Sequence, residues 1–98
     1  MIKKSYGKGN KTCRVTFELP AEMEATTASL AGDFNDWSPD ANPMTRRKDG
    51  RFSVTVSLPA ANTYRYRFLI DGERWENDWQ AEGYAHNDFG SEDSLLTV

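Results

Sequence analysis

The chain has 98 residues but only one cysteine and one histidine. The single cysteine, Cys13, cannot form an intramolecular disulfide, which excludes a disulfide-stapled scaffold. Cys13 lies in an alternating apolar segment and no histidine is near it in the sequence. We therefore expect a small buried side chain there rather than a nucleophile. Cys13 and His86 together cannot complete a zinc site, so no resident metal is expected.

Long apolar runs are also missing. No segment approaches the roughly 18 consecutive apolar residues of a membrane-spanning helix. Lys3 and Lys4 follow the start of the chain, but the apolar stretch of a secretory signal does not come after them. We therefore expect a soluble protein of the reducing cytoplasm, without a membrane partner.

An excess of positive charge is absent as well. The 12 Lys and Arg residues are outnumbered by 15 Asp and Glu residues, which gives a formal net charge of −3 and a pI near 5.1. Proteins that bind phosphate backbones depend on a basic surface. The run Arg46, Arg47 and Lys48 is too short to provide one. A nucleic-acid partner is therefore not expected.

The sequence shows no catalytic motif. It contains neither a serine-nucleophile motif nor a glycine-rich phosphate loop. Its carboxylates fall mostly in turns or at outward strand positions, and no pattern marks a buried pair such as a glycosidase uses. We therefore expect a protein that is not an enzyme and carries no cofactor.

What the sequence does contain is a repeated alternation of apolar and polar residues, typical of half-buried strands. Turn signals containing proline or glycine separate these stretches, and a long helical period is missing. Short strands at this spacing predict an all-β, immunoglobulin-like antiparallel sandwich. The alternating apolar positions are Cys13, Val15, Phe17 and Leu19; Phe52, Val54, Val56 and Leu58; and Tyr64, Tyr66, Phe68 and Ile70. Shorter candidate strands are residues 26–31 and 95–98.

The first eleven residues look different from the rest. They contain four lysines and two glycines, and Ile2 and Tyr6 are their only large apolar side chains apart from the initial methionine. This composition predicts a flexible N-terminal arm over residues 1–11. Residues 12–98 are then a single β-sandwich domain, in keeping with the chain length.

Two aromatic residues fall in the turn-rich segment 32–38, where a regular strand cannot bury both of them. One division buries Phe34 as the anchor of the loop and leaves the indole of Trp37 at the surface. The alternative is that Trp37 packs over the edge of the core.

The position of Trp75 depends on the length of the turn at Asp71 and Gly72. A two-residue turn places Trp75 opposite Phe68, on the core side of the sheet. A three-residue turn places it opposite Leu69, on the outer side. A shift of one residue in the register therefore decides between core and surface, and the residues alone leave both open.

An exposed pair of indoles beside arginine and amide groups suits a carbohydrate. One face of a pyranose ring presents C–H bonds and stacks on an aromatic ring, while the hydroxyls at its rim need donors and acceptors. Such a site is shallow, and its affinity for a short sugar is low.

Three segments resemble the family 48 carbohydrate-binding modules. They are Gly-Asp-Phe-Asn-Asp-Trp-Ser at 32–38, Tyr-Arg-Tyr-Arg-Phe-Leu-Ile-Asp-Gly-Glu-Arg-Trp at 64–75, and the closing segment 89–98. This family includes the glycogen-binding domain of the AMP-activated protein kinase β subunit and the N-terminal sandwich of isoamylases and glycogen branching enzymes. The resemblance covers residues 14–98 in the order of the family. It implies a β-sandwich that binds α-1,4-glucans such as glycogen, starch and maltooligosaccharides.

The resemblance also implies which residues bind the sugar. Two tryptophans of the kinase-type members stack on glucose, and the matching positions are Trp37 and Trp75, which implies the outer face for Trp75. A hydroxyl-binding lysine is matched by Arg67, which keeps the charge with a wider donor set. Trp79 is a second candidate for the stacking role of Trp75.

The last loop supplies three more candidates. Phe89 matches a leucine that inserts against the sugar, and its ring either stacks on the ligand or anchors the loop. Asp93 matches an asparagine; it accepts hydrogen bonds from hydroxyls but cannot donate, a departure that threatens affinity. Ser91 offers a hydroxyl in the same loop.

Family members are usually joined to a catalytic domain or belong to a multi-subunit kinase, and no catalytic portion follows residue 98. We therefore expect a free-standing module, or one that associates with a glycoside hydrolase or branching enzyme made from another chain. The alternative function is a protein-docking module that keeps the fold and uses exposed aromatics and an edge strand without binding sugar.

Overall fold

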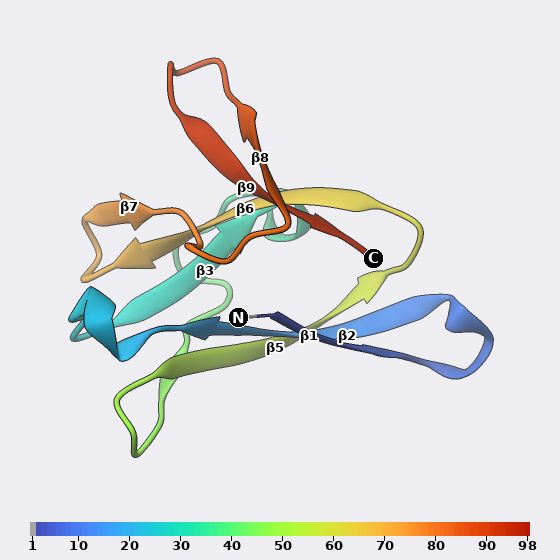
Figure 1. The fold of residues 1–98 in the computed structure, drawn as a ribbon, viewed down its shortest axis with the longest axis horizontal. Coiled ribbons are helices and arrows are strands. Elements are labelled where there is room, and N and C mark those ends of the chain that lie inside the picture. Colours follow the sequence, from blue (N-terminus) through green and yellow to red (C-terminus); the bar gives the residue numbers. More distant parts are fainter. Residues whose placement is uncertain (1) are drawn as a thin grey trace.

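Two antiparallel sheets pack face to face in the computed structural model, which describes residues 2–98 (Figure 1). One sheet has the strand order β1-β2-β5-β4 and the other has the order β3-β6-β9-β8, with β7 also paired to β6. This arrangement confirms the predicted all-β sandwich. The strands are β1 (Ile2–Tyr6), β2 (Thr12–Leu19), β3 (Ala28–Gly32), β4 (Thr45–Arg46), β5 (Phe52–Pro59), β6 (Thr63–Ile70), β7 (Arg74–Glu76), β8 (Gly83–His86) and β9 (Glu92–Thr97).

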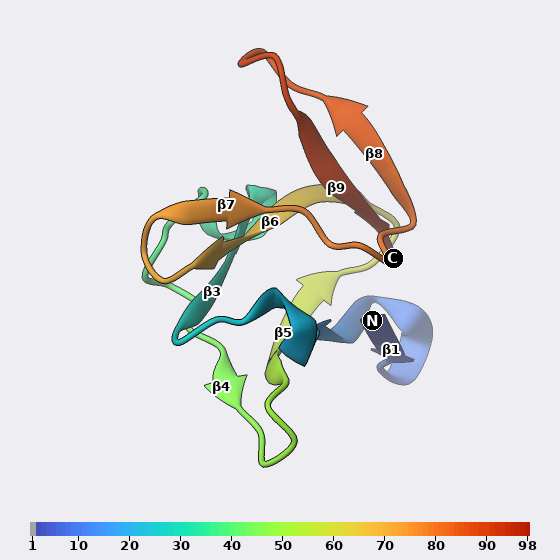
Figure 2. The ribbon, with the colours of Figure 1, turned by 60° about the vertical axis from the view of Figure 1, so that its left-hand side comes forward.

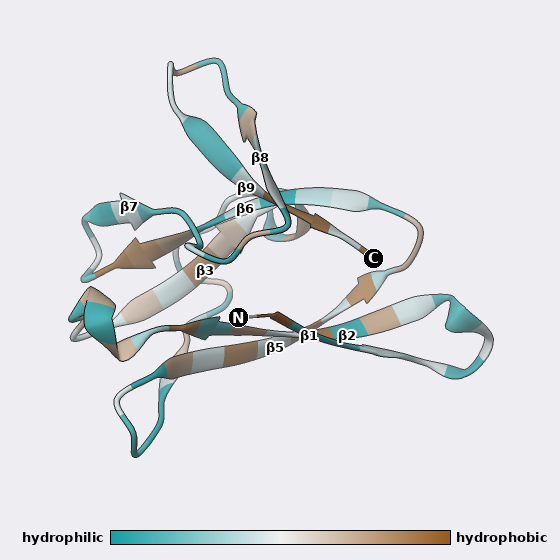
Figure 3. Cartoon of the chain, in the orientation of Figure 1, coloured by the Kyte–Doolittle hydropathy of each residue, from teal (hydrophilic) through white to brown (hydrophobic). Residues whose placement is uncertain are grey.

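The core lies between the two sheets and is built from the alternating positions. In the register of β2 against β5, Val15 pairs with Val56 and Phe17 pairs with Val54. Alternation sends every second side chain of a strand inward, and Tyr66 and Phe68 of β6 meet the β2 side chains from the opposite sheet. Cys13 is fully buried among them, as expected. Figure 3 shows hydrophobic residues concentrated where the sheets face each other.

Strand β6 organises the second sheet because it has three neighbours. Along one edge it pairs with β3, and along the other it pairs first with β9 and then with β7. β9 pairs with β6 along only part of its length. The rest of β9, together with β8, forms a hairpin that projects from the sandwich (Figures 1 and 2). The distal part of this hairpin is mostly hydrophilic, with a few apolar residues (Figure 3). Its tip is therefore available to a ligand rather than to the core.

The predicted arm of residues 1–11 is wrong for most of its length. Met1 lies outside the described residues, but Ile2–Tyr6 form β1, which pairs along its whole length with β2. Ile2 packs on the core, and Lys4 Nζ donates to Glu82 Oε2 at 2.7 Å. An edge strand buries only one side. Within β1, Ile2 packs on the core while Tyr6 is exposed, so no alternating apolar pattern reveals the strand.

The remaining differences concern short elements. The candidate strand at 26–31 corresponds to β3, and the candidate at 95–98 corresponds to the end of β9. The strands β4 and β8 have two and four residues and were not predicted, whereas the three-residue β7 is the strand that both turn lengths at Asp71 and Gly72 assumed beside β6. In the described part of the chain, no helix is long and apolar enough to cross a membrane.

Candidate functional site

A groove of about 440 Å³ lies on the outer side of the second sheet, beside the β8–β9 hairpin. It brings together six of the residues that were singled out from the sequence and adds Arg65 and Asn87. Trp79 does not line it. The lining residues are Trp37, Arg65, Arg67, Trp75, Asn87, Phe89, Ser91 and Asp93.

The loop that carries Trp37 begins with a close approach to β6. A Cβ atom on Gly32 would lie 2.4 Å from the carbonyl oxygen of Arg65, so glycine is required there. The chain then turns sharply, and Asp36 and Trp37 adopt φ values of 56° and 57°. Positive φ is uncommon for residues with a side chain and is concentrated at functional positions. The turn thus holds a strained backbone conformation that presents one indole.

Two polar side chains of this loop hold Trp37 in place. Asp33 accepts from the indole Nε1 of Trp37 at 3.1 Å and from the backbone N–H of Arg65 at 2.9 Å. Asn35 donates to the carbonyl of Leu30 at 3.0 Å and accepts from the N–H of Gly32 at 3.0 Å. The Trp37 side chain is therefore half-buried, and Asp33 links its indole N–H to the backbone of β6. Its remaining surface faces the groove.

Phe34 is the buried anchor of the loop, which is the first of the two arrangements that the sequence allowed for Phe34 and Trp37. Its ring packs against the core and lies 6.0 Å from the Phe17 ring, centroid to centroid.

Trp75 lies on the outer face of the sheet. The register pairs Ile70 with Arg74 and Leu69 with Trp75, so the three-residue turn is present. The indole is 43% exposed. Its centroid is 6.5 Å from that of Trp37, and the two planes are inclined by 61°. The two rings thus form angled walls rather than one flat platform.

The β8–β9 hairpin holds the side chain of Arg67 in place. Its Nε lies 3.0 Å from Asp93 Oδ1, and its Nη2 donates to the hydroxyl of Ser91 at 2.6 Å and to the carbonyl of Glu92. Among residues 2–98, Nη1 makes no hydrogen bond, so the groove contains one oriented guanidinium with a donor still available. Asp93 also accepts from Arg65 Nη1 at 3.4 Å. The buried Asp93 carboxylate therefore pairs with two arginines, and the three side chains together keep one net positive charge.

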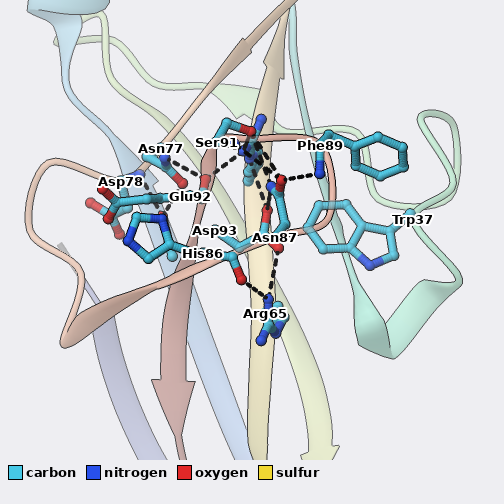
Figure 4. Close-up of polar contacts among 12 residues, drawn as sticks. Trp37, Arg65, Asn77, Asp78, His86, Asn87, Phe89, Ser91, Glu92 and Asp93 are labelled. Carbon is cyan, nitrogen blue, oxygen red and sulfur yellow. Dashed lines mark hydrogen bonds and ion pairs between the residues drawn. The ribbon is translucent and has the colours of Figure 1, made fainter.

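The tip of the hairpin is braced by Asn87, which the sequence analysis did not identify. Its Oδ1 accepts from the backbone N–H of Phe89 at 2.9 Å and of Ser91 at 3.2 Å. Its Nδ2 donates to Ser91 Oγ at 3.0 Å and to Asp93 Oδ1 at 3.1 Å. Figure 4 shows this network between the hairpin and Arg65. The phenyl ring of Phe89 is 94% exposed, so it does not anchor the loop.

Trp79 belongs to a different surface. It is 57% exposed and follows Asp78, whose carboxylate accepts from the hydroxyl of Tyr66 at 2.8 Å inside the sandwich. Burial and the adjacent carboxylate raise the pKa of the Tyr66 hydroxyl far above its usual value, so it stays protonated and donates. The anchored Asp78 therefore fixes the backbone beneath Trp79, away from the groove.

The groove has the groups for binding rather than for covalent chemistry. Its only carboxylate, Asp93, is paired with arginine, and no nucleophile–base pair lies among its lining residues. Within residues 2–98, no group of three or more His, Cys, Asp and Glu side chains is placed to hold a metal ion. The available interactions are ring stacking and hydrogen bonding.

A sandwich that presents angled tryptophans beside an oriented arginine, an amide and a hydroxyl defines a carbohydrate-binding module. The chain belongs to the family described as the glycogen recognition site of AMP-activated protein kinase, which matches residues 13–98. It is also similar to the 1,4-alpha-glucan branching enzyme GlgB of Aquifex aeolicus (strain VF5), at 35% identity over 66 residues. These residues are 66% of this chain and 10% of the branching enzyme, so the chain spans a small part of that relative.

Proposed function

We propose that this protein is a non-catalytic module that binds α-1,4-glucans, with glucose rings stacked on Trp37 and Trp75. The observation that carries the proposal is the meeting of these two indoles in one groove, 6.5 Å apart. The family match to a glycogen recognition site supports the choice of ligand.

Each part of the groove has a role in this proposal. The inclination of the indoles by 61° suits consecutive sugar rings of a curved chain better than one flat surface would. Arg67 donates to ring hydroxyls, and Ser91 and Asn87 line the polar side of the groove. Phe89 lies above it as a third apolar surface. Two stacked sugars that net about 4–6 kcal/mol give a Kd from roughly millimolar to tens of micromolar.

The test is a titration of tryptophan fluorescence with maltoheptaose, comparing the wild type with Trp37→Ala and Trp79→Ala. Loss of roughly 60 Å² of stacked ring face removes about 1.5 kcal/mol, which is about a tenfold loss of affinity. We expect that loss in Trp37→Ala. Trp79→Ala is the matched control, because it removes an exposed indole outside the groove.

A saturable signal in the wild type and in Trp79→Ala, weakened in Trp37→Ala, supports the proposal. A flat response of the wild type at high sugar concentration refutes it. Equal affinity of a folded Trp37→Ala variant removes Trp37 from the site.

A second candidate function is docking to a separate glucan-metabolising enzyme, and the observation that favours it is Trp79. A 57% exposed indole on a fixed turn is typical of a residue that a partner covers. Electrophoresis in a gel that contains glycogen separates the two functions. A glucan-binding module is retarded, whereas a module that only docks is not.

A further inference from the structure

A second hollow lies on the opposite face of the β8–β9 hairpin from the groove. Its volume is about 550 Å³, and it is separate from the groove except that Ser91 belongs to both linings. The lining residues are Asn77, Tyr84, His86, Gly90, Ser91 and Glu92. The tip of the hairpin is thus a thin wall with a hollow on each side.

Tyr84 gives this hollow an aromatic surface of the same kind as Trp37 gives the groove. It is 45% exposed, and its hydroxyl donates to the backbone carbonyl of Asp78. The indole N–H of Trp37 likewise already donates a hydrogen bond within the protein, to Asp33. In both cases the polar atom of the ring is already satisfied, so the exposed part is an apolar face held at a fixed angle.

The support beneath Tyr84 is rigid. Asp78 is buried and accepts from the Tyr66 hydroxyl at 2.8 Å, and its backbone N–H donates to Ser94 Oγ at 3.0 Å. Ser94 Oγ in turn donates to Asn77 Oδ1 at 2.8 Å. The tyrosine ring therefore stands on a buried hydrogen-bond network, and little conformational freedom is lost when a ligand stacks on it.

Polar groups surround the ring on the side away from the groove. His86 and Glu92 are opposite each other in the register of β8 and β9, two positions from Tyr84 on the same face. Figure 4 shows His86, Glu92 and Asn77 together on this side of the hairpin, away from Phe89 and Trp37. In the described part of the chain, the His86 imidazole makes no hydrogen bond. It offers a donor and an acceptor to a hydroxylated ligand.

We propose that this hollow is a second sugar-binding surface, on which a glucose ring of an α-glucan stacks on Tyr84 and hydrogen-bonds to His86 and Glu92. The choice of ligand rests on the proposed function of the groove. A polymer supplies many rings at once, so two surfaces on one hairpin raise the apparent affinity for a branched or folded glucan. The second surface has one aromatic ring where the groove has two, so it binds a free oligosaccharide more weakly than the groove does. Its Kd is expected to be about millimolar or higher.

The experiment uses NMR and the fact that His86 is the only histidine. Its imidazole signal reports on the second surface, and the three tryptophan indole N–H signals report on the groove and on Trp79. Maltoheptaose is titrated into the wild type, Trp37→Ala and Tyr84→Leu. The leucine keeps an apolar side chain beside Asp78 but removes the flat ring.

We expect the His86 signal to shift along a saturable curve in the wild type and still to shift in Trp37→Ala. In Tyr84→Leu the His86 shift is lost while the indole signals of the groove still respond. A His86 signal that stays stationary up to roughly 50 mM maltoheptaose, where a millimolar surface would be occupied, while the tryptophan signals saturate, overturns the second surface alone. Loss of the His86 shift in Trp37→Ala also overturns it. Stationary tryptophan and histidine signals refute the proposed function and this inference together.

The dispersion of the indole signals shows whether Tyr84→Leu is folded. If it is not, the comparison of the wild type with Trp37→Ala decides the question by itself.

Discussion

At the scale of single residues, the groove depends on side chains that hold others in place. Asp33 fixes Trp37, Asn87 fixes the loop of Phe89, and Asp93 orients Arg67. The family resemblance implied that Asp93 contacts sugar, but its buried carboxylate is occupied by two arginines and by Asn87. Its anionic form therefore serves the groove by pairing with cations, a role that an uncharged asparagine performs less strongly.

Asn87→Ala is expected to weaken maltoheptaose binding about fivefold, because the Phe89 loop loses its brace. A double-mutant cycle with Phe89→Ala distinguishes positioning from a direct contact. If Asn87 acts through Phe89, the substitution has little further effect once the phenyl ring is gone.

Hydrogen exchange provides a readout of this positioning that needs no sugar. The Phe89 amide donates to Asn87 Oδ1, so its exchange should accelerate in Asn87→Ala. Unchanged exchange, or fully additive effects in the cycle, contradicts the positioning role.

Phe68→Ala tests the assignment of the inward face of β6. The side chain is fully buried, and its ring lies 6.0 Å from the ring of Tyr66, centroid to centroid. Truncation should lower the free energy of unfolding by about 3–5 kcal/mol, measured by urea denaturation. Phe89→Ala is the matched control, since a 94% exposed phenyl ring contributes little to the core. Similar stabilities of the two variants would contradict the assignment.

At the scale of elements, the β6–β7 turn decides where Trp75 lies. Asp71 fastens this turn to the segment before β3, because its Oδ1 accepts from the N–H of Thr26 at 2.7 Å and of Thr27 at 3.0 Å. The hydrogen bond from the Thr27 N–H has the largest effect and that from the Thr26 N–H the next; both lower the pKa of the Asp71 carboxyl below its usual 3.8. The turn that presents Trp75 is thus tied to the residues just before β3, the strand that leads into the Trp37 loop.

The lowered pKa of Asp71 predicts a pH dependence of stability. A carboxyl whose pKa is lower in the folded state stabilises the fold at pH values above 3.8, and this contribution is lost as the pH falls through the folded-state pKa. Asp71→Asn keeps an acceptor oxygen but not the charge. The wild type should exceed this variant in unfolding free energy near about pH 7, and the difference should shrink as the pH is lowered to about 2.

Urea denaturation of both proteins at the two pH values measures this difference. A gap between them that is the same at both values would show that the charge of Asp71 does not contribute.

At the scale of the whole molecule, two sheets of four and five strands support one projecting hairpin (Figure 2). The formal net charge of −3 is spread over a surface whose groove is lined by two arginines and one aspartate. A neutral ligand that stacks on tryptophan is indifferent to the field of such a molecule, whereas a polyanion is not.

The affinity for maltoheptaose is therefore expected to change less than about twofold between roughly 0.05 M and 0.5 M NaCl. Fluorescence titrations at the two salt concentrations measure it. A steep fall in affinity with salt would indicate that charge, and not stacking, dominates binding.

Strands with several buried side chains could be predicted from the sequence, whereas strands with few could not. The long alternating segments of β2, β5 and β6 were predicted within one residue at each end, because the inward side chains of all three strands enter one core. β1 was missed because it is an edge strand in which Ile2 is the residue that packs on the core. The strand β8 was missed because four residues are too few to show alternation, and its pairing with β9 alone makes it a strand. The three-residue β7 was anticipated only as the partner of β6 across the turn at Asp71 and Gly72.

Some residues of the groove could likewise be recognised in the sequence, and others could not. Trp37, Trp75, Arg67 and Phe89 stand out in the sequence through their residue types and the family resemblance. Asn87 does not, because an asparagine in a loop between two strands is an ordinary turn residue until the loop folds back on it. An Asn-x-x-x-Ser spacing before a strand is the only local sign that such a brace exists.

The sequence by itself determined the class of fold, the buried face of the long strands and the identity of the aromatic residues, because alternation and residue type are local properties. The residues alone left the side of Trp75 open; the family resemblance implied the outer face, and the register in the tertiary structure placed it there. Only the tertiary structure decided the exclusion of Trp79 from the groove and the contacts of Asp93 and Asn87. These depend on a register of one residue and on contacts between distant segments, such as Arg67 with Asp93. Such contacts form only when the whole chain has folded.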